Sequence, residues 1–218
     1  MIMDILAFDC NYMCYRALHT TGWLRNGVAY GFLKAVKSTV DMVYPNVIVF
    51  AWDHGRSFRY QQLPGYKSTR KKAREKDPEK QRQYNLMQEQ VRLLKTEILP
   101  SLGAANNLYI DGYEADDILA LIAKHPLIEG YDRTGDIAIM IVSADQDMWQ
   151  LCERDHVVCR NPRTGDIVGE ADLLLRYGVT PPEFALVKAI EGCKTDDVPG
   201  IRGVGMATAI KHITGAKK

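Results

Sequence analysis

A short apolar run decides the fold of this chain: Ile137-Ala138-Ile139-Met140-Ile141-Val142. Its residues are continuously apolar rather than alternating with polar ones, which is typical of a strand buried on both faces of a parallel sheet. The run ends in Ser143-Ala144-Asp145-Gln146-Asp147, so two acids follow it closely. The pattern predicts a central strand with carboxylates at its carboxyl end.

Three further strands are predicted earlier in the chain. Residues 3–8 and 47–52 are mostly apolar and end at Asp9 and Asp53, and residues 108–110 lead into Glu114-Ala115-Asp116-Asp117. Helical patterns separate the strands, which indicates an α/β fold with a mostly parallel central sheet flanked by helices. The predicted helices cover residues 11–18, 30–43, 78–98, 118–123, 148–152, 171–177, 182–192 and 206–213, with a loop at 130–135 and a hairpin at 157–168.

The composition is that of an ordinary globular protein. The 218 residues are 46% hydrophobic and 25% charged, with a net charge of +1. No targeting signal and no run of about 20 apolar residues is visible, so no membrane partner is expected. The five cysteines form no CxxC pair and the five histidines no HxH or HExxH pattern. These features disfavour zinc and disulfides and predict that any metal is bound by oxygen, in a reducing, cytoplasm-like compartment.

A basic segment lies between the second and third predicted strands. Residues 56–95 contain twelve Lys or Arg against four Asp or Glu, with Tyr60, Tyr66 and Tyr84 interleaved. Lysine and arginine neutralise phosphates and tyrosines stack on unpaired bases, so the segment suits a nucleic acid. Its centre, residues 66–74, lacks the apolar content to pack, which leaves a solvated, disordered loop as the alternative.

Acids follow all four predicted strands. Singly, each acid has an ordinary alternative as a helix cap or a turn residue. Because ligands bind outside the carboxyl ends of strands in open α/β sheets, the acids together predict one site. Carboxylates without His or Cys favour one or two Mg²⁺ or Mn²⁺ ions, and a pair of such ions can promote hydrolysis of a phosphodiester. The seven acids are Asp9, Asp53, Glu114, Asp116, Asp117, Asp145 and Asp147.

The ordered set of motifs resembles the structure-specific 5′ nucleases, the family of flap endonucleases and 5′–3′ exonucleases, in particular its bacterial and bacteriophage members. Asp9 and Asp53 match the first two metal-site aspartates of that family. Residues 63–70 (Leu-Pro-Gly-Tyr-Lys-Ser-Thr-Arg) look like its P-x-Y-K-x-x-R signature, at the base of a helical arch. Residues 114–117 match its E-A-D-D motif and residues 145–147 its D-x-D motif. The resemblance implies a PIN-like 5′-nuclease core with a basic arch.

The resemblance also implies roles for single residues. Lys67 and Arg70 would contact the scissile phosphate, Asp116 and Asp117 would be catalytic, and Tyr66 would pack against a base or the arch. The implied substrate is DNA with a 5′ single-stranded flap or end, or an RNA–DNA hybrid. We expect the protein to be a monomer and to act in the cytoplasm of a bacterial or phage-infected cell. The implied DNA-binding residues are Arg59, Tyr66, Lys67, Arg70, Lys71, Lys72, Gly203 and Gly205.

The last segment resembles the start of the family's helix–three-turn–helix module. Residues 200–205 (Gly-Ile-Arg-Gly-Val-Gly) form a glycine-punctuated turn before a helix. In the family this turn binds duplex phosphates through backbone N–H groups, assisted by a monovalent cation such as K⁺. The implied organisation is a catalytic core at 1–192, with its arch region at 57–100, and the module's start at 193–218. Because the chain ends one helix into the module, we expect either a fragment or a reduced grip on duplex DNA.

One position departs from the family pattern. Where the family reads G-D-x-x-D-N, residues 192–197 read Gly-Cys-Lys-Thr-Asp-Asp. A thiol is a poor Mg²⁺ ligand, so a second metal ion would depend on Asp145, Asp147, Asp196 and Asp197. A protein that binds branched DNA without cutting it therefore stays open as an alternative. A PIN-type ribonuclease is a further alternative, although it would need neither an arch nor the glycine turn.

Overall fold

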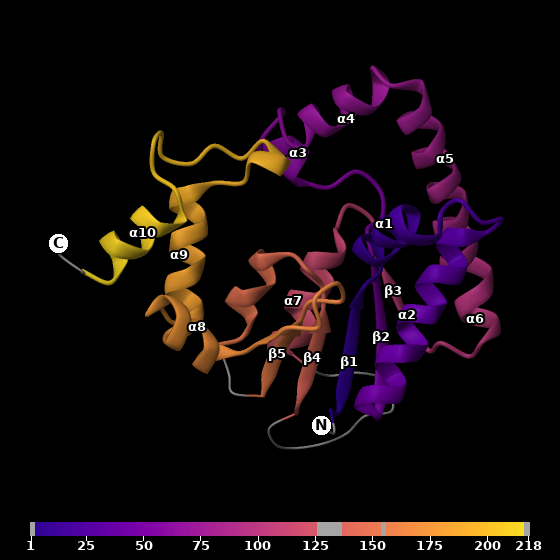
Figure 1. The fold of residues 1–218 in the computed structure, drawn as a ribbon, viewed down its shortest axis with the longest axis horizontal. Coiled ribbons are helices and arrows are strands. Elements are labelled where there is room, and N and C mark those ends of the chain that lie inside the picture. Colours follow the sequence, from indigo (N-terminus) through magenta and orange to yellow (C-terminus); the bar gives the residue numbers. More distant parts are fainter. Residues whose placement is uncertain (1–2, 126–136, 154–155, 216–218) are drawn as a thin grey trace.

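A central sheet of six strands organises the computed structural model, which describes residues 3–125, 137–153 and 156–215 (Figure 1). The strand order is β3-β2-β1-β4-β5-β6, and neighbouring strands pair in parallel except for β5 and β6. The predicted mostly parallel α/β fold is therefore confirmed. The predicted loop at 130–135 lies outside the described residues. The strands are β1 (Ile5–Asp9), β2 (Val47–Trp52), β3 (Asn106–Tyr109), β4 (Ile139–Val142), β5 (Val157–Arg160) and β6 (Ile167–Val168).

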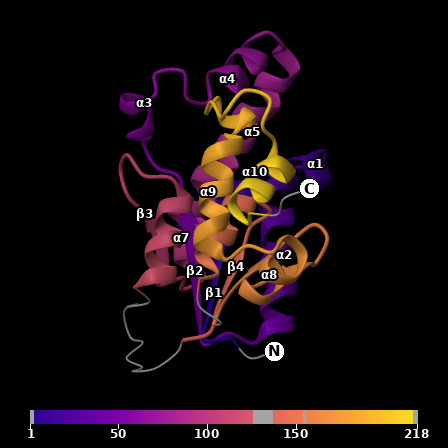
Figure 2. The ribbon, with the colours of Figure 1, turned by 90° about the vertical axis from the view of Figure 1, so that its left-hand side faces the viewer.

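Helices cover both faces of the sheet (Figures 1 and 2). Helices α1, α2 and α5 pack on one face, and α7 with the 3₁₀ helix η2 packs on the other. The C-terminal helices α8, α9 and α10 share a smaller apolar cluster of their own. The helices are α1 (Cys10–Thr21), α2 (Gly27–Val43), α3 (Arg59–Gln62), α4 (Ser68–Glu75), α5 (Pro78–Leu93), the π-helical η1 (Leu94–Ile98), α6 (Leu99–Ser101), α7 (Ala115–Lys124), η2 (Gln146–Leu151), α8 (Glu170–Tyr177), α9 (Pro181–Glu191), the 3₁₀ helix η3 (Lys194–Asp196) and α10 (Met206–Ile213).

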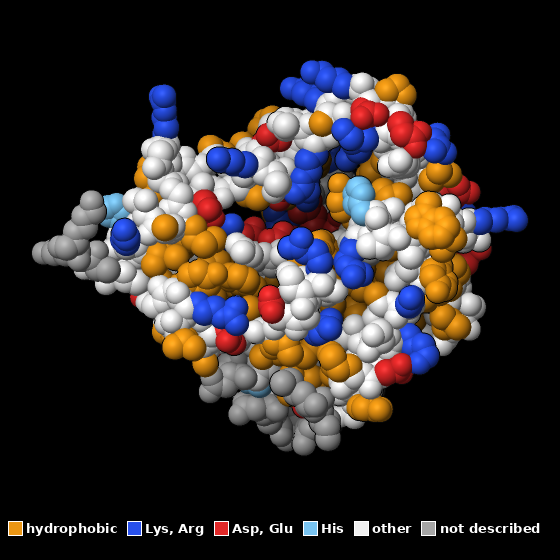
Figure 3. Space-filling model, viewed as in Figure 1, with side chains coloured by type: hydrophobic (Ala, Val, Ile, Leu, Met, Phe, Trp, Pro, Cys, Tyr) orange, Lys and Arg blue, Asp and Glu red, His pale blue; other side chains and the backbone are white. Residues whose placement is uncertain are grey.

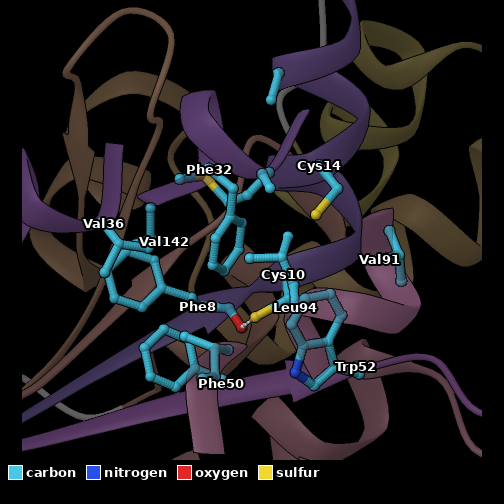
Figure 4. Packing of buried hydrophobic residues seen from close by; sticks show 14 of the residues in the cluster. Phe8, Cys10, Cys14, Phe32, Val36, Phe50, Trp52, Val91, Leu94 and Val142 are labelled. Carbon is cyan, nitrogen blue, oxygen red and sulfur yellow. Dashed lines mark hydrogen bonds between the residues drawn. The ribbon is translucent and has the colours of Figure 1, made fainter. Parts of the chain in front are cut away.

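The two apolar layers follow from the two-residue repeat of the central strands, which sends neighbouring side chains to opposite faces. In β1, Phe8 packs toward α1 and α2, whereas Ala7 lies on the side of α7. The Phe8 ring stacks on Phe50 of β2 at 5.8 Å, and Phe32 of α2 stacks on Trp52 at 5.6 Å (Figure 4). The first pair joins residues that are level with each other in β1 and β2, and the second joins α2 to β2.

Strand register brings the acids to one edge of the sheet. Phe8 of β1 is level with Phe50 of β2 and with Val142 of β4, so the three strands end at nearly the same height. The residues that follow, Asp9 and Ser143 among them, must then meet at the carboxyl edge. The segment from residue 59 to residue 93 comprises α3, α4 and α5, and its first part, α3 and α4 with the start of α5, lies above this edge (Figures 1 and 2). We call the whole segment the arch segment.

Two predictions of local structure need correction. A helix is predicted over residues 148–152, and the structure has the 3₁₀ helix η2 over 146–151, which Asp145 caps through the N–H of Asp147 at 2.9 Å. For residues 66–74, the alternative of a disordered loop is wrong: residues 68–75 form α4, although none of them is buried, and Tyr66 before it is 5% exposed. Partners distant in sequence, described below, stabilise α4. No helix in the described part of the chain is long and apolar enough to cross a membrane.

Candidate active site

Asp9 is the innermost of the acids at the carboxyl edge. It ends β1 and caps α1, where Oδ1 accepts the N–H of Tyr12 at 2.9 Å. Its other oxygen, Oδ2, accepts the hydroxyl of Ser143 at 2.9 Å, and the residue is 6% exposed. Burial, with smaller contributions from the charges of Asp53 and Asp145, raises the pKa of Asp9 to about 7. As an anion, this carboxylate lacks a neutralising cation among the described residues.

Asp53 and Asp116 lie beside Asp9. Asp53 follows β2, and its Oδ1 accepts the first N–H of α7, that of Ala115, at 2.8 Å. Burial raises the pKa of Asp53. Burial also raises the pKa of Asp116 well above its usual range, and the charges of Asp9, Asp145 and Asp53 act in the same direction. Asp9, Asp53, Asp116 and Asp145, which we call the central acids, therefore share one region of negative potential.

A second set of acids lies between η2 and the C-terminal segment, and each of its members already has a cation nearby. Asp147 Oδ1 is 3.4 Å from Lys188 Nζ, and Asp196 Oδ1 is 2.9 Å from Arg70 Nη2. Both oxygens are buried and make no hydrogen bond to the described residues. Burial and the charge of Asp145 raise the pKa of Asp147, with Lys188 opposing them. These two oxygens therefore have ion-pair partners but no hydrogen bond among the described residues.

Glu114 connects α7 to the base of the arch segment. Its Oε2 accepts the Tyr66 hydroxyl at 2.8 Å and its Oε1 accepts Lys67 Nζ at 2.8 Å, while Arg59 Nη1 is 3.6 Å from Oε2. Burial alone would lower the pKa of Lys67, but the bond to Glu114 outweighs it and raises that pKa. Tyr66 also packs edge-on against Tyr60 of α3. Tyr66 was predicted to pack against a base or against the arch. The contact with Tyr60 is a contact within the arch segment, and packing against a base remains a prediction.

Asp117 differs from Asp116 in its surroundings. Both of its oxygens accept from the guanidinium of Arg59, at 2.8 and 2.7 Å, and Oδ2 also accepts the N–H of Glu114 at 3.0 Å. Burial opposes the shift, but these bonds hold the pKa of Asp117 below its usual range. The structure therefore places Asp117 on Arg59 rather than with the central acids. Its predicted metal-binding and catalytic roles remain predictions, as does DNA binding by Arg59.

The predicted second-site ligands are also divided. Asp197 faces α4, where Oδ2 accepts the N–H of Thr69 at 2.8 Å and Oδ1 accepts its hydroxyl at 2.5 Å. Cys193 is half-buried, and its Sγ lies 3.1 Å from the hydroxyl oxygen of Thr195. Because of its bonds to Thr69, Asp197 is a partner of the arch segment in this structure.

The predicted DNA-binding residues Lys71 and Lys72 are exposed and lie on α4, on the surface of the arch segment.

A cavity of about 510 Å³ opens between the arch segment, α7, η2 and α9. In Figure 3, acidic side chains lie deep in a hollow whose rim carries basic ones. Both signs of charge line the cavity, with Lys124 and Lys188 on its walls. Its other polar or charged lining residues include Arg59, Tyr66, Glu114, Asp116, Asp117, Asp147, Cys193 and Asp196. A hollow of this kind can admit a chain of phosphates toward the acids.

The glycine turn lies apart from this hollow, before α10. Gly203 has a φ of 81°, a left-handed backbone that other residues rarely adopt. A Cβ at Gly203 or at Gly205 would meet no heavy atom within 4 Å among the described residues. Internal packing therefore does not require glycine at 205, and the surface there is open to an approaching ligand. DNA binding at these two positions remains a prediction.

The donor set suits a hard divalent cation, although the acids are not gathered into a coordination sphere. Among the described residues, no three Asp, Glu, His or Cys side chains are placed to hold a metal ion. The central acids nevertheless raise one another's pKa values, and they offer only carboxylate oxygens. A divalent cation would relieve this repulsion, and oxygen donors match Mg²⁺ or Mn²⁺. The residues therefore fit such an ion by charge and chemistry.

Three residues of the site were not predicted from the sequence. Ser143 donates a hydrogen bond to Asp9. It follows β4 directly, and this position at a strand end could have identified it. Lys95, in the π-helical η1, donates to the backbone oxygen of Asp53 at 3.1 Å. Lys188 of α9 contacts Asp147. Neither lysine has a local signal, because its partner lies about 40 residues away in sequence.

The fold and the site together define a class: an α/β core with carboxylates at the carboxyl edge of a mostly parallel sheet, beneath basic helices. The particular family follows from the comparisons. The family model of the 5′–3′ exonuclease, N-terminal resolvase-like domain, matches residues 4–178. The chain belongs to this family, and the resemblance drawn from its motifs is confirmed.

Known proteins agree with this assignment. The thermostable DNA polymerase I of Thermus aquaticus is 34% identical over 214 residues, which cover 95% of this chain and 23% of that protein. DNA polymerase I of Bacillus caldotenax is 27% identical over 226 residues, covering 97% and 23%. The chain thus spans about a quarter of the length of these curated relatives.

Solved structures share the fold. The T5 5′-exonuclease with bound zinc has a TM-score of 0.76 and 23% identity, covering 97% of this chain and 74% of that one. The catalytic core of Rad2 in complex with DNA substrate has a TM-score of 0.61 and 17% identity, covering 97% and 60%. At these identities, the likeness establishes the common architecture of the sheet and its flanking helices.

Proposed function

We propose that the chain is a divalent-metal-dependent 5′ nuclease that hydrolyses phosphodiester bonds where a single-stranded 5′ end meets duplex DNA. The observation that carries the proposal is the position of the central acids beneath the basic arch segment. Membership of the 5′–3′ exonuclease family and the likeness to structures bound to DNA support it. The monomer suffices, because all groups named below come from one chain.

The central acids would hold Mg²⁺ or Mn²⁺, which supplies an activated water and stabilises charge on the phosphate. Ser143 and the N–H groups of Tyr12 and Ala115 orient Asp9 and Asp53 for this purpose. Whether one or two ions bind depends on the second set of acids, where Cys193 replaces a carboxylate. Lys188 already contributes a positive charge beside Asp147.

Lys67 and Arg70 would contact the scissile phosphate. In this structure they contact Glu114 and Asp196, at the border between the acids and the arch segment. A phosphate that enters the hollow competes with these carboxylates for the two cations. Their charges would then stabilise the negative charge that develops as the phosphodiester is attacked. The exposed Lys71 and Lys72 would attract the single strand over a longer range.

The glycine turn would bind the duplex. Gly203 and Gly205 leave open space above the backbone that precedes α10. Backbone N–H groups at this helix start can donate to phosphates, and a K⁺ ion can assist them. We expect duplex affinity to depend on salt, since contacts with phosphates release counterions.

A labelled 5′-flap substrate tests the proposal directly. Cleavage near the junction is expected with Mg²⁺ or Mn²⁺, and none with EDTA. Comparing DNA, RNA and hybrid flaps at equal concentrations defines the substrate. Absence of cleavage with either ion would contradict the nuclease proposal.

A branched-DNA-binding protein without nuclease activity is the second candidate. Cys193 in place of a family aspartate favours it, together with the dispersed arrangement of the acids among the described residues. Tight binding of the flap substrate in EDTA, combined with no cleavage in Mg²⁺ or Mn²⁺, would identify this function.

A further inference from the structure

Helix α4 receives its N-terminal cap from the far end of the chain. Its own N-cap residue, Lys67, provides no side-chain cap. Instead the N–H of Thr69 donates to Asp197 Oδ2 at 2.8 Å, and the Thr69 hydroxyl donates to Oδ1 at 2.5 Å, across 128 residues of sequence. Free N–H groups at a helix start need such acceptors, and a carboxylate also complements the helix dipole. Asp197 therefore performs for α4 what a local Asp or Ser performs in most helices.

Further bonds surround this cap. The N–H of Lys67 donates to the backbone oxygen of Asp196 at 2.9 Å, and Arg70 pairs with the Asp196 carboxylate at 2.9 Å. Lys67 and Asp197 have φ values of 52° and 58°, so each of the two segments that meet here contains a non-glycine residue in the left-handed region. Such conformations are sparsely populated and persist where surrounding contacts specify them. The junction of α4 with η3 is such a place.

The cap matters because α4 has few other contacts: near its end, the Arg74 guanidinium lies over the Tyr84 ring of α5 at 3.9 Å. None of its residues is buried, so it lacks the apolar packing that stabilises most helices in proteins. Yet its start carries the two cations that face the acids: Lys67 contacts Glu114 at 2.8 Å, and Arg70 contacts Asp196. Their positions therefore depend on the polar contacts at the start of α4.

Asp197 also belongs to a short loop, residues 193–198, that leads to the glycine turn. Cys193 and Val198 exchange backbone hydrogen bonds at 3.0 and 2.9 Å around η3. Gly200 follows, packed so closely on α9 that a Cβ there would lie 2.1 Å from the backbone oxygen of Glu191. Asp197 and the start of the glycine turn therefore belong to one closely packed loop.

We infer that Asp197 is a positioning residue rather than a metal ligand. It caps α4 so that Lys67 and Arg70 face the acids, and it couples duplex DNA bound at the glycine turn to the order of α4. The inference rests on the proposed function for the identity of the ligand. The cap itself is independent of that function.

Limited trypsin digestion of the full chain measures the coupling, because α4 contains Arg70, Lys71, Lys72 and Arg74. Cleavage within α4 is followed by mass spectrometry, with and without a blunt DNA duplex that has no single strand. In the unmodified chain, the duplex should slow cleavage of α4 about tenfold. In Asp197→Ala, α4 should be cut about tenfold faster and the duplex should protect it little.

Asp77→Ala is the matched control. Asp77 caps the neighbouring helix α5 through the N–H of Lys80 at 3.2 Å, entirely within the arch segment. This variant should keep the protection of α4 by the duplex, since it leaves the bonds between Thr69 and Asp197 intact. Equal loss of protection in both variants would overturn the inference, because it would reflect general loosening of the arch segment.

Two further measurements separate a cap from a metal ligand. Asp197→Asn keeps an acceptor oxygen and should restore most of the protection that Asp197→Ala loses. Mn²⁺ affinity, read from the electron paramagnetic resonance signal of free Mn²⁺, should be the same in both variants and in the unmodified chain. Weaker Mn²⁺ binding in Asp197→Ala would overturn the inference. Failure of the unmodified chain to cut a flap, with protection intact, would instead contradict the proposed function alone.

Discussion

Arg59 and Asp117 face each other in a two-point ion pair, with Nη1 and Nη2 at 2.8 and 2.7 Å from the two carboxylate oxygens. This pair connects the first helix of the arch segment to the start of α7. The preceding residue, Asp116, instead has its pKa raised by burial and by the charges of Asp9, Asp145 and Asp53. Two adjacent aspartates of one motif thus take different positions, one among the central acids and one at the base of the arch segment.

The two aspartates should therefore respond differently to the same substitution. Asp116→Asn should lower flap cleavage by at least about 100-fold, because it removes a central acid, while binding of the flap in EDTA is retained. Asp117→Asn should reduce cleavage much less. Single-turnover cleavage and fluorescence anisotropy provide the two measurements. Equal losses of cleavage would show that Asp117 is catalytic as the motif implies, and full activity of Asp116→Asn would refute the site.

Loss of the two-point pair should reduce stability. Arg59→Ala should lower the free energy of unfolding by about 1–2 kcal/mol, since the pair is partly buried and both of its bonds join charged groups. Urea denaturation measures this change. Arg82→Ala is the matched control, because Arg82 makes a similar two-point contact with Glu79 at 2.9 and 2.8 Å on the exposed surface of α5. It should leave stability unchanged within error. Similar losses in both variants would contradict a structural role specific to Arg59.

The stability of the chain without divalent ions should fall as pH rises from about 4 to about 7. Asp9 has its pKa raised to about 7, so in this range the folded chain retains a proton that the unfolded chain has lost. The raised pKa values of Asp53 and Asp116 act in the same direction. Thermal unfolding in EDTA across this range measures the effect, and a stability that rises with pH would contradict it.

Divalent ions should reverse that loss. Mg²⁺ should raise the melting temperature by about 5 °C at pH 7.5 and by much less at pH 4.5, where protons compete for the same oxygens. Asp116→Asn should stabilise the chain in EDTA at pH 7.5, because it removes a repelling charge, and should remove most of the Mg²⁺ effect. An equal Mg²⁺ effect at both pH values would argue against binding to the central acids.

Cys193→Asp should create a second ion site. With a third carboxylate beside those of Asp147 and Asp196, the Mn²⁺ stoichiometry measured by paramagnetic resonance should rise from about one to about two per chain, and flap cleavage should increase. Cys193→Ser serves as the control, because it replaces the thiol without adding charge, and it should leave the stoichiometry unchanged. Two ions in the unmodified chain would show that Cys193 does not impair the second site.

The strands and the acids at their ends were predictable because both signals are local. Runs such as residues 47–52 and 137–142 are short, continuously apolar and rich in β-branched residues, which favours buried strands, and Asp9 and Asp53 follow their strands directly. The order of α4 was not predictable in the same way. Its composition indicates a solvated segment, and its capping partner Asp197 lies 128 residues beyond Thr69.

The sequence by itself determined the parallel sheet and the edge at which the carboxylates meet, because short-range apolar patterns and strand ends specify both. It also determined the family, through the ordered motifs at residues 63–70, 114–117 and 145–147. Only the tertiary structure decided which carboxylate does what. Side chains of successive helical residues point about 100° apart, so Asp116 and Asp117 necessarily face different neighbours. The identity of those neighbours depends on chain packing: Arg59 contacts Asp117, Lys67 contacts Glu114 and Thr69 contacts Asp197. These contacts join segments 47 to 128 residues apart, and no local pattern encodes them.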